Sequence, residues 1–362
     1  MAKSSVIPFG PQHPVLPEPV HLDLVVEDEK CIKAIPQIGF IHRGLEKMVE
    51  RYDYNQFIYF AERICGICAF GHSMGYAETI ESLLDIEIPP RAECLRVIWH
   101  ELSRIHSNIL WLGLAADAFG FESLFMHSWR VRERVLDIFE KTCGGRVILS
   151  VTQVGGVNRD IENSELRAIV DTLDSIKSDY EKICNTLIND YSVKNRTVGV
   201  GYISKEEAID LSMVGPFGRA SGVEYDVRMF KKGGYRYLKE FEPVISNDGD
   251  CYARVVVRAK EVVHAIEIIK EIVEVIPDGE INVKVKDSVP DGKSASNILE
   301  QPRGECYYYA RGNGSKFLSR MRMRTPTSQN IGGMTKALEG CDLADVNMIV
   351  LTIDPCISCA ER

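Results

Sequence analysis

The sequence contains no run of about 20 consecutive apolar residues, the length that a membrane-spanning helix needs. Its longest apolar stretch, 109–121, is shorter and contains Asp117. The opening segment, MAKSSVIPFG, lacks the apolar region of an export signal. We therefore expect any association with a membrane to come through other subunits.

Positive charge is also scarce. The chain has 43 Lys and Arg against 52 Asp and Glu, which gives a formal net charge of -9 and a pI near 5.5. Binding to nucleic acid needs a basic surface, and the sequence shows none, so we expect no nucleic-acid partner. No linker, run of like charges or internal repeat interrupts the apolar pattern, and residues 1–362 are predicted to form a single domain.

Helical periodicity dominates what is present. The composition, 45% hydrophobic and 26% charged, allows a large core. Apolar residues recur at the i, i+3, i+4 and i+7 spacing of amphipathic helices in five segments, near 43–61, 72–85, 90–117, 120–143 and 163–191. The third segment is apolar enough for the centre of a bundle. The predicted fold class is α+β and predominantly α, with a helical core at about 43–245.

Smaller β elements are expected at the N-terminus and in the C-terminal half. Alternating apolar and polar residues within 18–40, about a turn at 27–29, predict a β-hairpin. A smaller α/β region is expected at about 250–325. There the pattern predicts a β-branched, strand-like run at 253–258 and a helix at 261–275. A loop is predicted at 287–303, followed by strands at 305–311 and 317–324. The segment 326–362 is expected to bind metal.

Eleven cysteines are many for a chain in a reducing compartment, where thiols favour metal or redox roles over structural disulfides. Seven stand alone and are expected to be small buried apolar side chains. The other four form two Cys-x-x-Cys pairs, Cys65 with Cys68 and Cys356 with Cys359. The first pair precedes a helical segment, so we expect its sulfurs at a helix N-terminus, where positive partial charge favours thiolates.

Four thiolates together make a soft site that suits nickel, zinc, Cu(I) or iron-sulfur chemistry. One pair alone would favour a thioredoxin-like redox motif or half of a structural zinc site. Structural zinc pairs are usually spaced by roughly 15–20 residues, whereas these pairs are separated by nearly the whole chain. The spacing therefore favours a centre at the heart of a large fold, but it does not by itself choose the metal.

A family resemblance narrows the choice. The motifs that carry it are, in order, GPQHP at 10–14, GFIHRGLEK at 39–47, RICGICAFGHS at 63–73, GGVNRD at 155–160, RASG at 219–222, QPRG at 301–304, RTPT at 324–327 and DPCISCAER at 354–362. With them, essentially the whole chain resembles the large subunits of [NiFe] hydrogenases, especially the energy-converting (Ech-type) and CO-induced membrane-bound group. That group is similar to the 49-kDa, quinone-site subunit of respiratory complex I.

The resemblance implies a [NiFe] large-subunit fold and a nickel-iron centre. Cys65 and Cys356 would be terminal nickel ligands, whereas Cys68 and Cys359 would bridge nickel to an iron that carries CO and cyanide. Maturation proteins would install those small ligands. Nickel would keep an open position for hydrogen, as a catalytic metal centre requires.

The same resemblance assigns roles to four further residues. Glu18 would accept a proton close to the metals. Arg303 would overhang the open site and donate hydrogen bonds to a cyanide ligand. Thr327 would bond the other cyanide, and Asp354 would orient Arg303. Without the resemblance, Glu18 would be interpreted as an exposed loop residue, and Asp354, next to Pro355, as a turn residue.

One more acidic residue and three histidines complete the expected site. Glu46 matches a carboxylate that holds magnesium or iron in related enzymes. Better-known members place a histidine where this sequence has Arg362, which cannot ligate a metal, so occupancy at Glu46 is in question. We expect His13 and His42 to be hydrogen-bonded structural residues. His72 is the candidate for the metal environment, next to a bridging thiolate or a nearby cluster.

The partners follow from the same resemblance. They are a small subunit with a [4Fe-4S] cluster, ferredoxin-like electron-transfer subunits, integral membrane subunits that translocate ions, and maturation proteins. The expected activity is reversible reduction of protons to H₂ with electrons from reduced ferredoxin, at the cytoplasmic face of the cell membrane. Two other hypotheses stay open: a metal-free quinone-site subunit of a complex I-like NADH dehydrogenase, and a binding protein with structural zinc.

Overall fold

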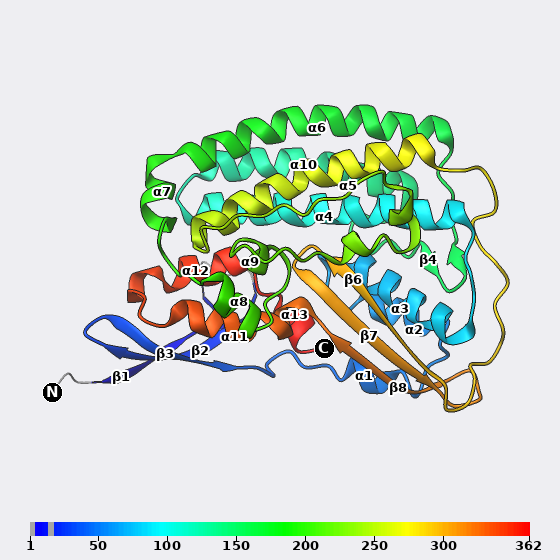
Figure 1. The fold of residues 1–362 in the computed structure, drawn as a ribbon, viewed down its shortest axis with the longest axis horizontal. Helices are drawn as coiled ribbons and strands as arrows, with labels where there is room; N and C mark the ends of the chain where they lie inside the picture. The colour runs from blue at the N-terminus through cyan, green and yellow to red at the C-terminus, as the bar shows by residue number, and fades with distance from the viewer. Residues whose placement is uncertain (1–3, 14–17) are drawn as a thin grey trace.

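The computed structural model describes residues 4–13 and 18–362. Pro14, the last residue of the GPQHP motif, lies outside this part of the chain. Figure 1 shows a layer of long helices above a lower layer that contains two separate sheets and several short helices. The predicted class, α+β and predominantly α, is confirmed.

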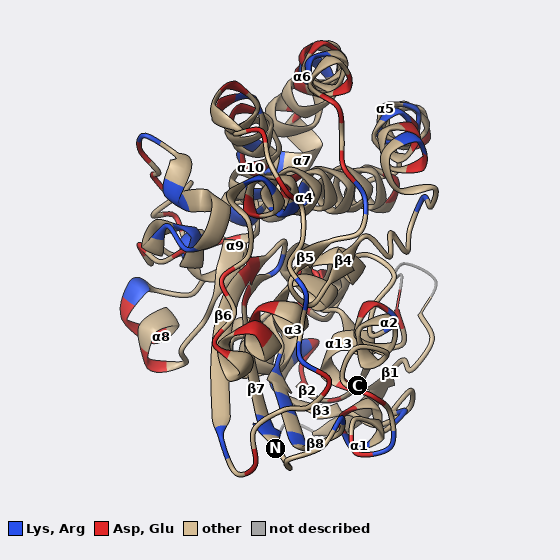
Figure 2. Cartoon of the chain, turned by 90° about the vertical axis from the view of Figure 1, so that its right-hand side faces the viewer, with Lys and Arg blue, Asp and Glu red and all other residues tan. Residues whose placement is uncertain are grey.

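The upper layer is a bundle of four long helices, α4 (Pro90–Ala118), α5 (Glu122–Cys143), α6 (Asn163–Asn189) and α10 (Cys251–Val275). Helix α4 packs against both α5 and α10, and its side chains are buried on nearly all sides. Figure 2 shows residues of both charge signs on α5 and α6, which leave only one face apolar. The long apolar segment was therefore correctly predicted to lie at the centre of the bundle.

The strand-like run predicted at 253–258 is wrong. These residues belong to α10, which begins where the Asp250 side chain accepts a hydrogen bond from Ala253 N at 2.8 Å. Burial against α4 outweighs the preference of β-branched residues for strands, because packing contributes more than intrinsic propensity. Helix α10 therefore completes the bundle instead of opening a separate mixed region.

The N-terminal sheet is antiparallel, in the order β1 (Ser5–Phe9), β2 (His21–Glu27) and β3 (Lys30–Gln37). The predicted hairpin is confirmed, since β2 and β3 are joined at Asp28 and Glu29, both with positive φ. The sequence did not reveal β1. The inner face of this sheet packs against helices α11 (Pro326–Leu338) and α12 (Val346–Ile353).

The second sheet consists of β6 (Ser294–Gln301), β7 (Gly304–Gly312) and β8 (Leu318–Arg324). The strands predicted at 305–311 and 317–324 are confirmed as β7 and β8. The loop predicted at 287–303 is wrong in its second half, where β6 pairs with β7. The sequence did not predict β6 because Glu300 and Gln301 are polar, which suggested a surface loop. Both side chains are in fact buried beneath the bundle.

Shorter elements connect these parts. They are α1 (Leu45–Met48), α2 (Phe57–Glu62), α3 (Ala69–Leu84), β4 (Thr152–Gln153), β5 (Gly156–Val157), α7 (Tyr191–Thr197), α8 (Lys205–Asp210), α9 (Gly215–Arg219), α11 (Pro326–Leu338), α12 (Val346–Ile353), α13 (Ile357–Ala360) and 3₁₀ turns at 227–230, 233–237 and 343–345. The helix predicted at 43–61 is thus split into α1 and α2. Within the described residues, no helix is both long and apolar enough to cross a membrane.

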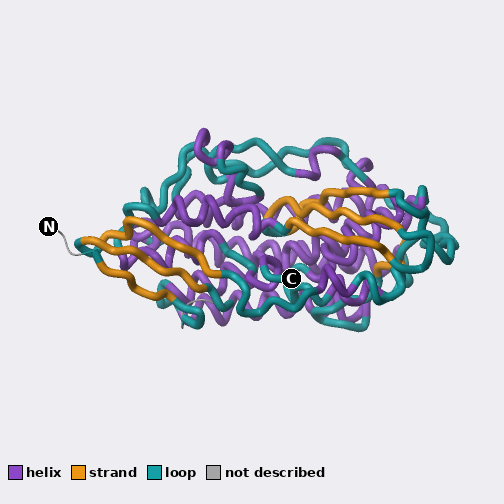
Figure 3. The backbone as a smooth tube through the Cα atoms, turned by 90° about the horizontal axis from the view of Figure 1, so that it is seen from below, coloured by secondary structure: helices purple, strands orange, loops and turns teal. Residues whose placement is uncertain are grey.

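Two features of the lower layer position the site. Helix α3 packs against β6 and β7, directly after the first cysteine pair. Figure 3 shows the two sheets at opposite ends of the molecule, with the C-terminus between them. The closing segment of the chain therefore reaches the middle of the fold, close to α3.

Candidate metal centre

The first cysteine pair lies in the turn between α2 and α3. Cys68 is the N-cap residue of α3, as the sequence predicted, and Ile67 N donates a hydrogen bond to Cys65 Sγ at 3.3 Å. Both thiols are buried. The short turn therefore directs two sulfurs toward the same interior point.

The second pair follows a sharp reversal of the chain. Helix α12 ends at Asp354, whose φ of 59° is left-handed, and Cys356 then caps the short helix α13. Asp is one of the residues that tolerate this conformation, and the following Pro355 cannot continue a helix. The reversal buries Cys356 and Cys359 as completely as the first pair.

The four sulfurs lie in one cluster. Cys68 Sγ lies 3.4 Å from Cys359 Sγ, and Cys65 Sγ lies 3.4 Å from Cys356 Sγ. The sulfurs of Cys65, Cys68 and Cys359 all lie within 4.8 Å of one another. A disulfide would need about 2.05 Å. Two sulfurs that share one metal ion, at bonds of about 2.3 Å, lie roughly 3.3 to 3.8 Å apart, so the geometry fits a metal centre.

Charge gives an independent argument for a metal. Hydrogen bonds from Cys356 and Cys359 hold the pKa of the Cys68 thiol well below its ordinary value. The contact with Cys356 raises the pKa of Cys359 well above its ordinary value. Four buried sulfurs therefore cannot all be thiolates unless a cation compensates them, and soft thiolates select a soft transition metal.

His72 and Tyr308 hold one side of the sulfur cluster. His72 Nε2 lies 3.3 Å from Cys359 Sγ, and Nδ1 hydrogen-bonds the Tyr308 hydroxyl on β7. His72 thus lies next to a sulfur of the cluster, which is the position that the sequence predicted for it. No sequence signal identified Tyr308, because it comes from a strand 236 residues further along the chain.

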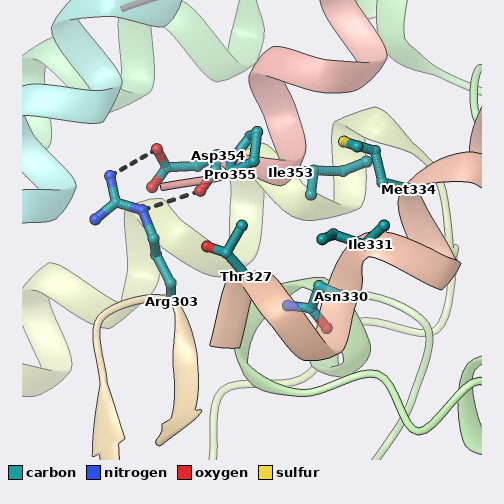
Figure 4. A pocket seen from close by; sticks show the side chains of 8 residues that line it. All are labelled: Arg303, Thr327, Asn330, Ile331, Met334, Ile353, Asp354 and Pro355. Atoms are coloured by element: carbon teal, nitrogen blue, oxygen red, sulfur yellow. Dashed lines mark hydrogen bonds and ion pairs between the residues drawn. The ribbon is translucent and has the colours of Figure 1, made fainter. Parts of the chain in front are cut away.

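Arg303 and Asp354 form the rim of the site (Figure 4). Arg303, in the turn between β6 and β7, donates from Nε to Asp354 O and from NH2 to Asp354 Oδ1, both at 2.9 Å. Its NH1 is buried without a partner. Burial opposes the charged form, but Asp354 and the cysteine sulfurs hold the pKa of Arg303 well above its usual value. One guanidinium nitrogen thus stays free for a ligand.

Thr327 lies across the same pocket from Arg303 (Figure 4). It is the second residue of α11, and its Oγ1 accepts a hydrogen bond from Cys356 N at 2.9 Å. A hydroxyl that accepts in this way can still donate its own proton. Thr327 therefore fixes the backbone of Cys356 and keeps a donor available.

Glu18 is hydrogen-bonded to the segment between the second two cysteines. Its Oε2 accepts from Ser358 N at 3.2 Å and also from Ile357 N. Burial raises the pKa of this carboxyl, while Arg303 opposes the rise. Glu18 shares a small cavity with Trp111 and Asp354. It is therefore not the exposed loop residue that its local sequence alone would suggest.

Two family models match parts of this sequence. Residues 118–296 and 287–362 match the family described as respiratory-chain NADH dehydrogenase, 49 Kd subunit, and residues 43–114 match the family described as nickel-dependent hydrogenase. The chain belongs to this hydrogenase and complex I family. The resemblance predicted from the motifs is confirmed.

Individual relatives fall on both sides of the family. The alpha subunit of a membrane-bound hydrogenase of Pyrococcus furiosus is 35% identical, over 98% of this chain and 87% of its own. A carbon monoxide-induced hydrogenase of Rhodospirillum rubrum is 33% identical, over 98% and 99%. A subunit of the NADH-quinone oxidoreductase of Desulforamulus reducens is 34% identical, over 96% and 95%.

A solved structure confirms the fold. A chain of the membrane-bound sulfane sulfur reductase, an archaeal respiratory membrane complex, superposes with a TM-score of 0.91 at 29% identity, and the match covers 99% of this chain and 98% of the other. These relatives are subunits of multisubunit membrane complexes. The family is therefore certain, while its members carry out different reactions.

Glu46 does not fit the hard-metal site that the family resemblance suggested. Its carboxylate accepts hydrogen bonds from Arg322 NH1 at 2.8 Å, Met323 N at 2.9 Å and Arg362 Nε at 3.1 Å. Two guanidinium groups already balance the carboxylate, and they take the acceptor positions that a divalent cation would need. Arg362 supplies positive charge at this place.

The two remaining histidines lie nearer the surface. His42 Nδ1 lies 3.0 Å from Glu361 O, and the ring of His13 stacks on Phe9 with centroids 4.6 Å apart. The hydrogen bond of His42 is the structural contact expected for it. Arg258 was missed: its NH1 lies 3.3 Å from Asp354 Oδ2, deep in the bundle. No local pattern pointed to Arg258, because it stands in the β-branched run that was predicted to be strand-like.

Proposed function

We propose that the chain is the catalytic large subunit of an energy-converting [NiFe] hydrogenase. The single observation that carries the proposal is the meeting of four buried cysteine sulfurs from opposite ends of the chain. Four sulfurs drawn from distant segments into one buried cluster form a ligand set for a soft metal ion, for which a metal-free scaffold has no use. Among the described residues, no second group of three or more metal-ligating side chains comes together.

The two sulfur contacts support the division of ligand roles. Cys68 and Cys359 pair with each other and are assigned as the bridging ligands, while Cys65 and Cys356 pair with each other and are assigned as the terminal nickel ligands. When bound, the nickel-iron centre, with CO and cyanide on iron, supplies the position at which H₂ is split into a proton and a hydride.

The residues around the sulfur cluster have three roles: they bind the ligands of the metal centre, orient one another and accept protons. Arg303 NH1 and the Thr327 hydroxyl would donate hydrogen bonds to the two cyanide ligands, and Asp354 fixes the direction of Arg303 through two contacts at 2.9 Å. Glu18 accepts the proton released near the sulfurs. Its hydrogen bonds to the backbone of Ile357 and Ser358 keep its carboxyl in place beside the second cysteine pair.

Electrons and ions require partners. A small subunit with a [4Fe-4S] cluster, docked near the first cysteine pair, would carry electrons between this site and a ferredoxin-like subunit. Integral membrane subunits would couple the reaction to ion translocation, and the chain would be a peripheral subunit at the cytoplasmic face of the membrane. The relatives are themselves subunits of membrane complexes, which supports this assignment.

The alternative is a metal-free quinone-site subunit of a complex I-like NADH dehydrogenase, since the family includes such members. Elemental analysis and infrared spectroscopy of the purified complex test both hypotheses. Nickel and iron together, with CO and cyanide stretching bands, are expected. A complex without metal, or with zinc alone, would overturn the proposal.

A further inference from the structure

A buried group of charged side chains continues inward from the rim of the metal site. Asp354 Oδ2 lies 3.3 Å from Arg258 NH1 on α10, and Glu261 follows Arg258 by one helical turn. Glu261 Oε1 accepts from Arg219 NH2 at 2.5 Å, and Arg219 NH1 donates to Glu300 Oε1 at 2.8 Å. Asp354 and Arg258 form one part of this buried group, Glu261, Arg219 and Glu300 on β6 form the other, and the spacing of Arg258 and Glu261 on α10 brings the two parts next to each other.

Unpaired polar atoms line the first part of this connection. Arg258 Nε, Glu261 Oε2 and both polar side-chain atoms of Asn108 are buried without a hydrogen-bond partner in the protein. Asn108 follows Arg104 by four residues and precedes Trp111 by three on α4, so it shares their face. Arg104 lies 4.0 Å from Glu261, and Trp111 stacks on Arg258. An ordered buried water molecule needs two to four polar partners, and these unpaired polar atoms can provide them.

The inner part of the group has more carboxylates than guanidiniums. All its members are at most 2% exposed: Arg104, Arg219, Arg228, Glu101, Asp226, Glu261 and Glu300. Arg258 and Arg303 both contact Asp354, so the larger group that includes them is balanced in charge. Within the inner part, however, Asp226 and Glu300 share one nitrogen, Arg219 NH1, at 3.2 and 2.8 Å. Two carboxylates this close favour the protonated form of one of them. Burial, reinforced by Asp226, raises the pKa of Glu300 to about 7.

Glu300 meets a second carboxyl at a small internal cavity. Glu300 and Glu78 both line this cavity, between α3 and the turn at 227–230. Glu78 also lines a cleft of about 410 Å³ on the other side, together with Glu93 and Arg96. Burial raises the pKa of Glu78 to about 7, and its carboxylate accepts from Asn297 at 2.6 Å. Glu78 therefore separates the internal cavity from the open cleft.

We propose that Glu261, Glu300 and Glu78, with ordered water between them, form a proton route from the metal site to this cleft. The route begins at Glu18, which shares a cavity with Asp354 and Trp111. In each step a carboxylic O–H gives its proton to a neighbouring water or carboxylate, and no electron moves. The guanidiniums keep their charge and only hold the carboxylates in position. The inference rests on the proposed hydrogenase function, because it requires a proton source at the metals.

The test replaces Glu300 by Gln in the whole complex. Glutamine keeps the shape of the protonated side chain but cannot pass a proton on, so exchange between H₂ and D₂O should fall by at least about tenfold. Glu78→Gln, nearer the surface, should act in the same way. Glu93→Gln is the matched control, because Glu93 lines the cleft but not the internal cavity. Exchange within about twofold of the wild type in both Glu300→Gln and Glu78→Gln would overturn the proposal.

A second readout does not depend on turnover. The infrared band of protonated carboxyl groups should titrate near pH 7 in the wild-type complex and lose amplitude in each of the two variants. The charged groups that face Glu300 are Asp226, Arg104, Arg219 and Arg228, and those that face Glu78 are Arg96, Glu81 and Lys232. Identical titrations in wild type and both variants would overturn the route. Missing nickel in the wild type would instead overturn the hydrogenase proposal, so the two failures are distinguishable.

Discussion

Cys68 Sγ and Cys359 Sγ lie 3.4 Å apart, although 291 residues separate them in the chain. The contact requires α3, which begins beside Cys68, and α13, which carries Cys359, to point at the same place. Closing a loop of this length costs conformational entropy that only the packing around it can offset. The contact between the two thiols therefore depends on the whole fold. A metal ion that binds both thiols in the folded state in turn stabilises that fold.

Replacing Cys359 by Ser should abolish nickel binding together with the CO and cyanide bands. A serine hydroxyl is a hard, poorly ionised ligand and cannot bridge two soft metals. The matched control is Cys341→Ser, because Cys341 is half-buried and lies outside the sulfur cluster. Elemental analysis and infrared spectra of both purified complexes make the measurement. Full nickel content in Cys359→Ser would contradict the assigned ligand set.

Replacing Glu18 by Gln should leave the CO and cyanide bands in place while proton exchange with solvent slows by about a hundredfold or more. The glutamine oxygen can still accept from Ile357 N and Ser358 N, so the position of the second cysteine pair is kept. The measurement is the rate of H₂ exchange with D₂O. Glu122→Gln, at the exposed start of α5, serves as the control. An unchanged exchange rate in Glu18→Gln would show that Glu18 is not the proton acceptor.

Replacing Tyr308 by Phe should shift the infrared bands without loss of the metals. The variant removes the hydroxyl that bonds His72 Nδ1, and His72 in turn contacts Cys359 Sγ through Nε2. Loss of one such hydrogen bond costs about 1 kcal/mol, too little to unfold the chain. Tyr76→Phe is the control, because its hydroxyl bonds only the Tyr54 backbone. Bands identical to the wild type would mean that His72 does not influence the electron density of the cysteine sulfurs.

The contrast between Cys359 and Tyr308 explains what the sequence could predict. A Cys-x-x-Cys pair is a local pattern with its own chemistry, so the ligands could be identified before the structure. Tyr308, Arg258 and Glu300 have no local pattern, because each acquires its role from a partner on another element.

The same reason accounts for two of the differences between the predicted and the observed fold. Residues 253–258 and β6 were judged by local composition, although burial against α4 and α3 decides their conformation. The long amphipathic helices were predicted because their periodicity is itself local.

Replacing Arg362 by Ala should lower nickel retention, although Arg362 contacts no sulfur. Its guanidinium donates to Cys359 O at 3.3 Å and Ala360 O at 3.1 Å, and its Nε bonds Glu46 at 3.1 Å. These bonds fix the last turn of the chain beside the metal site. Loss of them leaves buried acceptors unpaired, which costs about 1–3 kcal/mol for each group.

Arg322→Ala is the matched control for this prediction. Arg322 bonds the same carboxylate of Glu46, but its side chain is 58% exposed, against 17% for Arg362. An exposed ion pair contributes at most about 1 kcal/mol, so this variant should keep its nickel. The nickel content after dialysis against a chelator is the measure of retention for Arg362→Ala and for Arg322→Ala. Equal retention in the two variants would show that the charge on Glu46, and not the hold of Arg362 on the Cys359 backbone, is what matters at this corner of the site.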